Sequence, residues 1–302
     1  MKPLLHLVLS ILLLFVTPSR AQDFPLKLVD ALGDTLTLHA YPERIVSLAP
    51  SNTELLFAVG AGSRVVGVTD HCNYPPDAAG KPKIGGFSDA NLELIVSRQP
   101  DLVLGARFNP RESLDGLRRF NIPVFVLAPS SVDETLSALL QVGRITGQDE
   151  AAARLEAALM LRVRAVQEAV DEIPVHARPR VLWGKLSAPM YTAGPGSFID
   201  DLIRLAGGGS IVHDASVNWP RVGLETIVDR NPQVIVVSST PPPEIGEALD
   251  RLRKTPGWEK IDAVISGRIY HINLDLLGRP GPRLVDGLER LAHAFHPDRF
   301  PQ

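Results

Sequence analysis

Two glutamates occupy equivalent positions in a stretch that the sequence contains twice. Residues 91–104 and 223–236 share Leu, Glu, Ile, Val, Arg and Pro at a constant offset of 132 residues, and the shared glutamates are Glu93 and Glu225. A carboxylate in a first helical turn stabilises the helix by roughly 0.3–1 kcal/mol, which would account for either glutamate alone. An acidic side chain protruding from each repeat could instead pair with arginines of a partner protein. The spacing alone favours neither interpretation.

A second group of candidate residues combines aromatic rings with a few polar side chains in predicted loops. Core packing is the commoner role of an aromatic residue, but a cleft with apolar walls and a few polar groups is the usual form of a ligand site. A lone loop histidine is more often solvated than a metal ligand, and an Asp–Arg pair is often only a surface contact. The members of this group are Tyr74, Phe87, Phe108, Tyr191, Trp219, His71, Asp275 and Arg279.

Motifs of enzymatic catalysis are missing from the sequence. The stretch 60–65 begins like a dinucleotide-binding fingerprint, but Val65 replaces the third glycine and the turn follows a predicted helix. We find no Walker loop, nucleophile elbow or paired-histidine zinc helix. His293 and His296 could chelate a metal, but cationic residues are common at helix C-termini, so we interpret them as surface residues. We therefore expect no enzymatic activity.

Composition and the N-terminus indicate an exported protein. The net charge of −3 and the scattered basic residues exclude nucleic acid and anionic membranes as expected partners. Residues 1–21 have the features of a signal peptide: Lys2, a short apolar core, and small residues before a cut after Ala21. The core is shorter than the roughly 20 residues of a membrane span, so an uncleaved anchor is the lesser alternative. The single cysteine, Cys72, is expected to be buried.

One long amphipathic helix is predicted near the middle of the chain. Apolar residues recur at helical spacing from Leu155 to Val170, with charged residues between them. Asp149 is the expected N-cap, and a helix of this length spans on the order of 33 Å. We predict that it links two lobes. The expected division is an N-terminal lobe over 22–147, a linking helix over 148–173 and a C-terminal lobe over 174–302.

The remaining pattern alternates short buried strands with helices. This order predicts an α/β fold with parallel-rich sheets, one in each of two similar lobes, and ligands held at the carboxyl ends of the strands. The repeated stretches would supply the same helix–turn–strand unit to each lobe, with a ligand cleft between them. In the first lobe, a helix over 53–59 is expected, capped by Ser51 or Asn52.

These residues resemble a known family. Residues 44–55, 66–68, 74–76, 91–93, 100–103 and 219–220 are similar to those of periplasmic substrate-binding proteins of ABC importers with a rigid helical linker, and most of all to the cobalamin receptors. The resemblance covers nearly the whole mature chain. It implies that Glu93 and Glu225 dock on arginines of the membrane permease. It also implies a ligand pocket with family positions at His71, Phe87, Tyr191, Trp219, Asp275 and Arg279. We add the loop aromatic Tyr74 to these predicted ligand residues.

Two positions differ from the cobalamin receptors. His71 stands where those receptors often have an aromatic residue, and Ala106 stands where they often have tryptophan. A histidine at the cleft could ligate cobalt in a corrinoid or iron in haem. We therefore expect a monomeric periplasmic receptor for cobalamin or a related corrinoid, with no cofactor of its own. The alternatives are a haem or iron-siderophore receptor, a two-lobed hydrolase or transferase, and a structural protein without a ligand.

Overall fold

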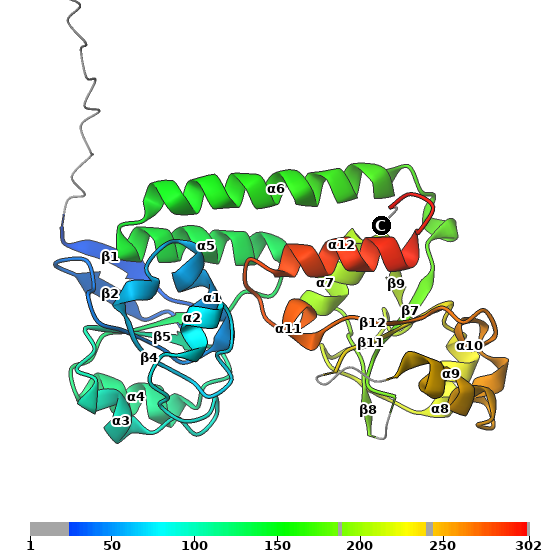
Figure 1. The fold of residues 1–302 in the computed structure, drawn as a ribbon, viewed down its shortest axis with the longest axis horizontal. Helices are drawn as coiled ribbons and strands as arrows, with labels where there is room; N and C mark the ends of the chain where they lie inside the picture. Colours follow the sequence, from blue (N-terminus) through cyan, green and yellow to red (C-terminus); the bar gives the residue numbers. More distant parts are fainter. Residues whose placement is uncertain (1–23, 187–188, 240–243, 301–302) are drawn as a thin grey trace, which may run out of the picture.

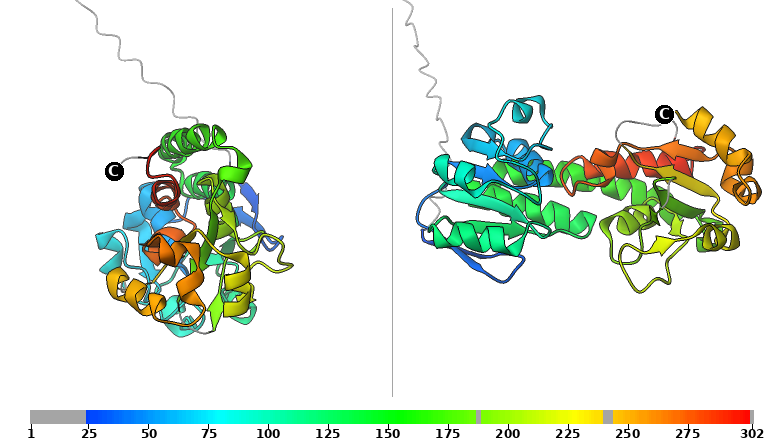
Figure 2. Two further views of the ribbon diagram at one scale, coloured as in Figure 1. Left: turned by 90° about the vertical axis from the view of Figure 1, so that its right-hand side faces the viewer. Right: turned by 90° about the horizontal axis from the view of Figure 1, so that it is seen from below.

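The computed structural model describes residues 24–186, 189–239 and 244–300, so the predicted signal peptide lies outside the described residues. Two α/β lobes stand side by side, and a layer of helices runs across both of them along one edge of the molecule (Figures 1 and 2). Among the described residues, no helix is both long enough and apolar enough to cross a membrane.

The N-terminal lobe is built on a four-stranded parallel sheet in the order β4-β3-β5-β6. Apolar residues line both faces of its inner strands, as expected for a parallel sheet that is covered by helices on both sides. An antiparallel hairpin precedes the sheet. The strands are β1 (Leu26–Val29), β2 (Thr35–Leu38), β3 (Ile45–Ser47), β4 (Val65–Val68), β5 (Leu102–Ala106) and β6 (Val124–Leu127). The helices are α1 (Pro50–Ala58), η1 (Gly62–Arg64), α2 (Pro76–Ala79), α3 (Leu92–Ser97), α4 (Arg111–Arg119) and α5 (Val132–Thr146).

The C-terminal lobe repeats this plan with a parallel sheet in the order β12-β11-β7-β9. It adds a two-residue antiparallel pair, β8 with β10, which is too short to produce an alternating pattern in the sequence. The strands are β7 (Arg180–Gly184), β8 (Met190–Tyr191), β9 (Gly209–Ser210), β10 (Arg221–Val222), β11 (Val234–Val237) and β12 (Ile269–His271). The helices are η2 (Val175–Ala177), α7 (Phe198–Leu205), α8 (Leu224–Arg230), α9 (Ile245–Arg253), η3 (Trp258–Lys260), α10 (Asp262–Ile265), α11 (Leu274–Leu277) and α12 (Leu284–Phe295).

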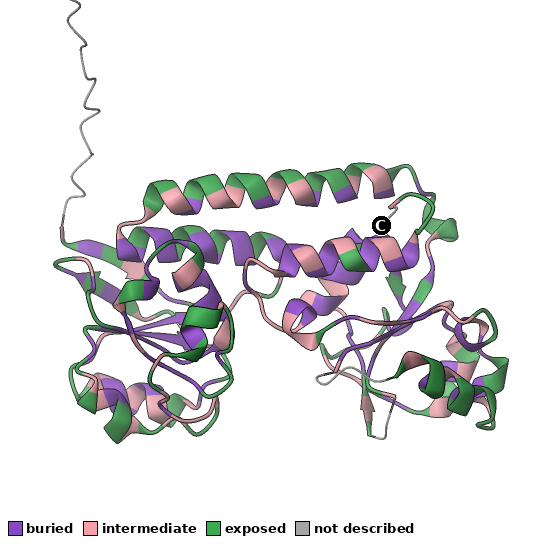
Figure 3. Cartoon of the chain, viewed as in Figure 1, coloured by how far each residue is buried: buried purple, intermediate pink, exposed green. Residues whose placement is uncertain are grey.

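The linking helix is α6 (Asp149–Asp171). It runs over α5 of the N-terminal lobe and α12 of the C-terminal lobe, with its apolar side turned toward them and its charged side exposed (Figures 1 and 3). Leu159, Val163 and Val166 are buried in this contact, as the periodicity predicts. Asp149 is the first residue of the helix rather than its N-cap, so that detail of the prediction is wrong.

Close packing fixes α6 against α5. A Cβ atom added to Gly143 would lie 2.4 Å from the Cβ atom of Ala152, so only glycine allows the two helices to approach this closely. On the other lobe, Arg162 of α6 bonds both carboxylate oxygens of Glu289 on α12, at 2.8 and 2.6 Å. The linker is therefore attached to each lobe by a specific contact.

The repeat predicted from the sequence is present in both lobes. The helices α3 and α8 begin 132 residues apart, and so do the strands β5 and β11 that follow them. An arginine at the start of a sheet strand donates to two carbonyls at the end of the helix in both lobes. Arg44 Nε, just before β3, donates to the carbonyls of Arg98 and Gln99, and Arg180 Nε, in β7, donates to those of Arg230 and Asn231. The two stretches belong to separate sheets, which confirms two similar lobes.

The start of α1 differs from the prediction. The helix begins at Pro50 with Ala49 as its N-cap, and no side chain caps it. Proline is well suited to the first helical position, so Ser51 and Asn52 fall inside the helix. The amide of Asn52 instead donates to the carbonyls of Leu104 and Gly105, which joins α1 to β5.

Candidate functional site

Four of the predicted ligand residues meet where the two lobes touch. The loop that follows β4 supplies His71 and Tyr74, and α11 and the turn after it supply Asp275 and Arg279. One Arg279 nitrogen donates to the carbonyl of His71 at 3.3 Å, and the other donates to the Asn73 side chain at 2.6 Å. The His71–Asn73 loop of one lobe is therefore hydrogen-bonded directly to the other lobe.

The Asp275–Arg279 pair is part of this contact. Its atoms lie 2.8 Å apart, and the two side chains are only 18% and 14% exposed. The Asn73 amide also donates to Asp275 at 3.3 Å. The pair that the sequence left open as a surface contact is thus largely buried between the lobes, where solvent screens it less.

A buried glutamate that the sequence analysis missed lies at the centre of the contact. Glu54 of α1 is 3% exposed. It accepts from Arg283 in a bidentate arrangement, at 2.9 and 2.6 Å, and lies 3.5 Å from Arg279. The guanidinium of Arg283 also lies over the ring of Tyr74, 3.8 Å from its centroid. Burial opposes the charge of Arg283, but the hydrogen bonds and the charge of Glu54 outweigh it and raise the pKa of Arg283.

The other three predicted ligand residues lie elsewhere: Tyr191 and Trp219 on adjoining segments of the C-terminal lobe, and Phe87 in the N-terminal lobe. Trp219 packs against Trp183 and Phe198, with ring centroids 6.0 and 5.8 Å away. Tyr191 of β8 is 53% exposed, and Phe87 of the N-terminal lobe is half-buried. Within the described residues, no hydrogen bond or ring contact joins any of these aromatics to the Glu54 cluster. Their role as ligand residues stays a prediction.

The protein shows no assembled metal site of its own in the described ranges, where no group of three or more His, Cys, Asp or Glu side chains is placed to hold an ion. His293 and His296 each bond a backbone carbonyl, of Phe300 and of Gly207 respectively. They do not converge as a chelate, and both are half-buried rather than solvated. The surface interpretation of these histidines is therefore wrong. Cys72 is fully buried, as predicted.

The environment of His296 leads to a prediction about pH. Burial lowers the pKa of His296, and the nearby cations Arg268, Arg299 and Arg178 act in the same direction, against the opposing bond to Gly207. The unfolded chain takes up this proton near pH 6.5, so the folding stability that His296 contributes is lost as the pH falls below that value. We expect His296→Gln to lose less unfolding free energy than the wild type between pH 7 and pH 5 in denaturant titrations. Parallel losses in the two proteins would contradict this.

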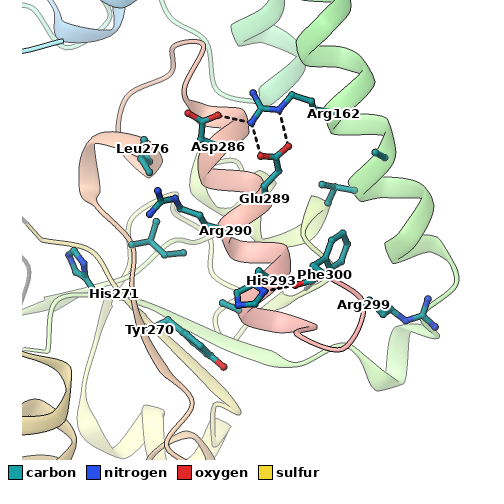
Figure 4. Close-up of a pocket in the computed structure, with 14 residues that line it drawn as sticks. Arg162, Tyr270, His271, Leu276, Asp286, Glu289, Arg290, His293, Arg299 and Phe300 are labelled. Carbon is teal, nitrogen blue, oxygen red and sulfur yellow. Dashed lines mark hydrogen bonds and ion pairs between the residues drawn. The ribbon is translucent and has the colours of Figure 1, made fainter. Parts of the chain in front are cut away.

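A cavity in the described part of the chain lies away from the interlobe contact. It has a volume of about 910 Å³ and lies between α6, α12 and β12. Figure 4 shows the ion pairs of Arg162 with Asp286 and Glu289 at one end, and Tyr270 and His271 at the other. None of the predicted ligand residues lines it.

Glu93 and Glu225 lie on the same edge of the molecule, opposite the linking helix. They are the second residues of α3 and α8, and both are exposed. The two helices lie at the lower edge of the two lobes in Figure 1. In the described part of the chain, no salt bridge involves either carboxylate. Both are therefore free to contact a partner that spans the two lobes.

Two similar lobes, a single rigid helical connection and ligand candidates at the interlobe contact define a two-lobed binding protein. A family model for "periplasmic binding protein" matches residues 45–276. The chain belongs to this family, the substrate-binding proteins of ABC importers.

Individual members of the family are similar along most of their length. A cobalamin-binding protein of Halobacterium salinarum is 33% identical over 290 residues, which cover 92% of this chain and 76% of the relative. The crystal structure of the periplasmic vitamin B12 binding protein BtuF of Vibrio cholerae has a TM-score of 0.75 at 25% identity, covering 86% of this chain and 99% of that one. The periplasmic haem-binding protein RhuT of Roseiflexus sp. RS-1 has a TM-score of 0.74 at 30% identity, covering 85% and 99%.

Proposed function

We propose that this protein captures cobalamin or a related corrinoid outside the cytoplasm, in the periplasm, and delivers it to the permease of an ABC importer without chemical change. The family supports the role in import, and the H. salinarum and V. cholerae relatives support the ligand class. The site residues are His71, Tyr74, Phe87, Tyr191, Trp219, Asp275 and Arg279. The protein would act as a monomer, because a single chain supplies both lobes.

We choose a corrinoid as the ligand because the charges of the interlobe cluster balance. Glu54 and Asp275 offset Arg279 and Arg283, so the cluster has no net charge. A corrinoid carries neutral amide side chains, which can hydrogen-bond to such a surface. Haem carries propionates and most iron-siderophores are anionic, so both would need an unpaired cation to offset their desolvation. Haem remains the rival ligand, because RhuT has a similar fold.

Absorption titration tests the ligand class. The purified mature protein, titrated with cyanocobalamin, should perturb the corrin bands and saturate at one ligand per chain. Haemin at the same concentrations should give no saturable change. Saturable binding of haemin alone would support the haem alternative, and binding of neither compound would overturn the proposal.

The same titration tests whether His71 ligates the metal of the ligand. The hydrogen bond from Arg279 goes to the His71 carbonyl, which leaves the imidazole available. Neutral imidazole is a good ligand for cobalt, and in aquocobalamin it can replace the bound water. We expect the wild type to shift the bands of aquocobalamin and His71→Ala to leave them in place. Equal shifts in both proteins would exclude ligation by His71.

A further inference from the structure

The bidentate pair between Glu54 and Arg283 joins elements that are distant in the sequence and belong to different lobes. Glu54 lies in the first helix after β3, and Arg283 is the N-cap of α12. The two side chains are 2% and 18% exposed. The backbone also approaches closely here, because a Cβ atom added to Gly281 would lie 3.5 Å from the Cβ atom of Glu54. The contact is thus a packed interface between the lobes rather than an exposed ion pair.

This interface adds a further connection to those that the helices along one edge of the molecule make. The helix α6 packs on α5 and α12, and α5 packs on α1. The lobes also meet where α5 packs on α7 and the Val132 amide donates to Asp201 at 2.9 Å. With these contacts along one edge alone, the lobes could still rotate about that edge. The bond from Arg283 at the N-terminus of α12 to Glu54 of α1 links the ends of the series α1–α5–α6–α12 into a ring, and a closed ring resists that rotation.

Neighbouring residues strengthen the same contact. Arg279 bonds to the His71–Asn73 loop and to Asp275, and the Tyr74 ring stacks on Arg283. The carboxylate of Glu54 contacts both arginines. It is therefore the group through which the C-terminal segment 275–283 is held against α1.

We propose that Glu54 and Arg283 are positioning residues that hold the two lobes in one relative orientation, here called their register. They thereby fix the distance between Glu93 and Glu225. A permease that binds both glutamates at once can use only the conformers with the right spacing. When the lobes leave this register, the fraction of molecules that can dock through both glutamates falls. The apparent affinity for the permease falls by the same factor. The consequence for import rests on the proposed function, whereas the effect on lobe register does not.

Spin labels beside the docking helices measure the register directly. Cysteines at Ser97 and Asp229 flank Glu93 and Glu225 on exposed positions, and the native Cys72 is fully buried. We expect a narrow distance distribution in the wild-type background and about a twofold broader one in Glu54→Gln, because the closed ring is opened. Import by the full transporter at saturating ligand should fall about tenfold if only a tenth of the protein keeps the register.

A double variant separates positioning from folding stability. Glu54→Gln alone leaves Arg283 buried without its carboxylate, which destabilises the fold, whereas Glu54→Gln with Arg283→Met removes both charges and should regain stability. The double variant should nevertheless keep the broad distribution and the low import. A narrow distribution and normal import in the stable double variant would overturn the proposal, because they would show that the pair only stabilises the fold.

The matched control is Asp115→Asn. Asp115 also accepts from two arginines, Arg111 and Arg118, but all three residues belong to α4 within one lobe. This variant should keep the narrow distribution. If the wild type itself bound no corrinoid, the proposed function would fail, and the distance distributions would still decide whether Glu54 and Arg283 set the register. Equal distributions in wild type and Glu54→Gln would disprove that role.

Discussion

Replacement of Glu93 and Glu225 together by alanine should abolish import while the affinity for the ligand stays unchanged. Both carboxylates are exposed, on short helices at the edge opposite α6, and neither belongs to the interlobe contact. Charge-assisted bonds between carboxylates and permease arginines would be desolvated on docking. Removing one partner of such a pair costs about 2–5 kcal/mol. Removing both glutamates should therefore cancel most of the binding free energy of a transient complex with the permease.

The measurement combines uptake of labelled cobalamin by reconstituted transporter with ligand titration of the free protein. Single variants should show partial loss, since one lobe still docks. Glu150→Ala with Glu168→Ala is the control, because it removes two exposed carboxylates from α6 on the opposite edge. Loss of ligand affinity in the Glu93/Glu225 variant would show that these residues serve the pocket instead, and undiminished uptake would disprove docking.

The repeated features of this fold could be predicted because each leaves a local pattern. The equivalence of Glu93 and Glu225 follows from two stretches that match at a fixed offset, and the structure gives both stretches the same helix and strand. The linking helix follows from apolar residues at helical spacing, four of which are buried at the positions expected. Each of these inferences depends on residues that are close in the sequence.

The interlobe cluster could not be predicted in the same way. Glu54 and Arg283 are far apart in the sequence, and neither belongs to the repeat. Glu54 lies in the family-like stretch 44–55, but that resemblance assigns it no partner. One signal was available: Glu54 precedes Leu55 and Leu56 in a mostly apolar helix, and a charge among buried residues requires a partner. That signal predicts an arginine or lysine nearby, but it does not say which one. Similarly, nothing local reveals that His296 bonds the carbonyl of Gly207.

Trp219→Ala should weaken corrinoid binding by roughly 30- to 150-fold, since truncation of a central aromatic contact costs about 2–3 kcal/mol. Backbone bonds hold the loop of Trp219 in place: the Gly194 amide donates to the Asn218 carbonyl at 2.9 Å and the Thr192 amide to the Pro220 carbonyl at 3.1 Å. Phe198 and Trp183 support one part of the indole, and the side chain remains half-buried. Its exposed part is thus a preorganised face on which a macrocycle can stack without ordering a loop.

Loss of packing has to be separated from loss of the stacking face. Phe198→Leu disturbs the support of Trp219 but leaves the indole present, so it should lower the unfolding free energy while affinity changes only a few-fold. Trp219→Phe keeps an aromatic face and should retain most of the affinity that Trp219→Ala loses. Fluorescence or absorption titrations at a temperature where every variant is folded provide the comparison. Equal affinity in Trp219→Ala and the wild type would show that Trp219 does not contact the ligand. The binding contacts would then have to come from the interlobe cluster around Glu54.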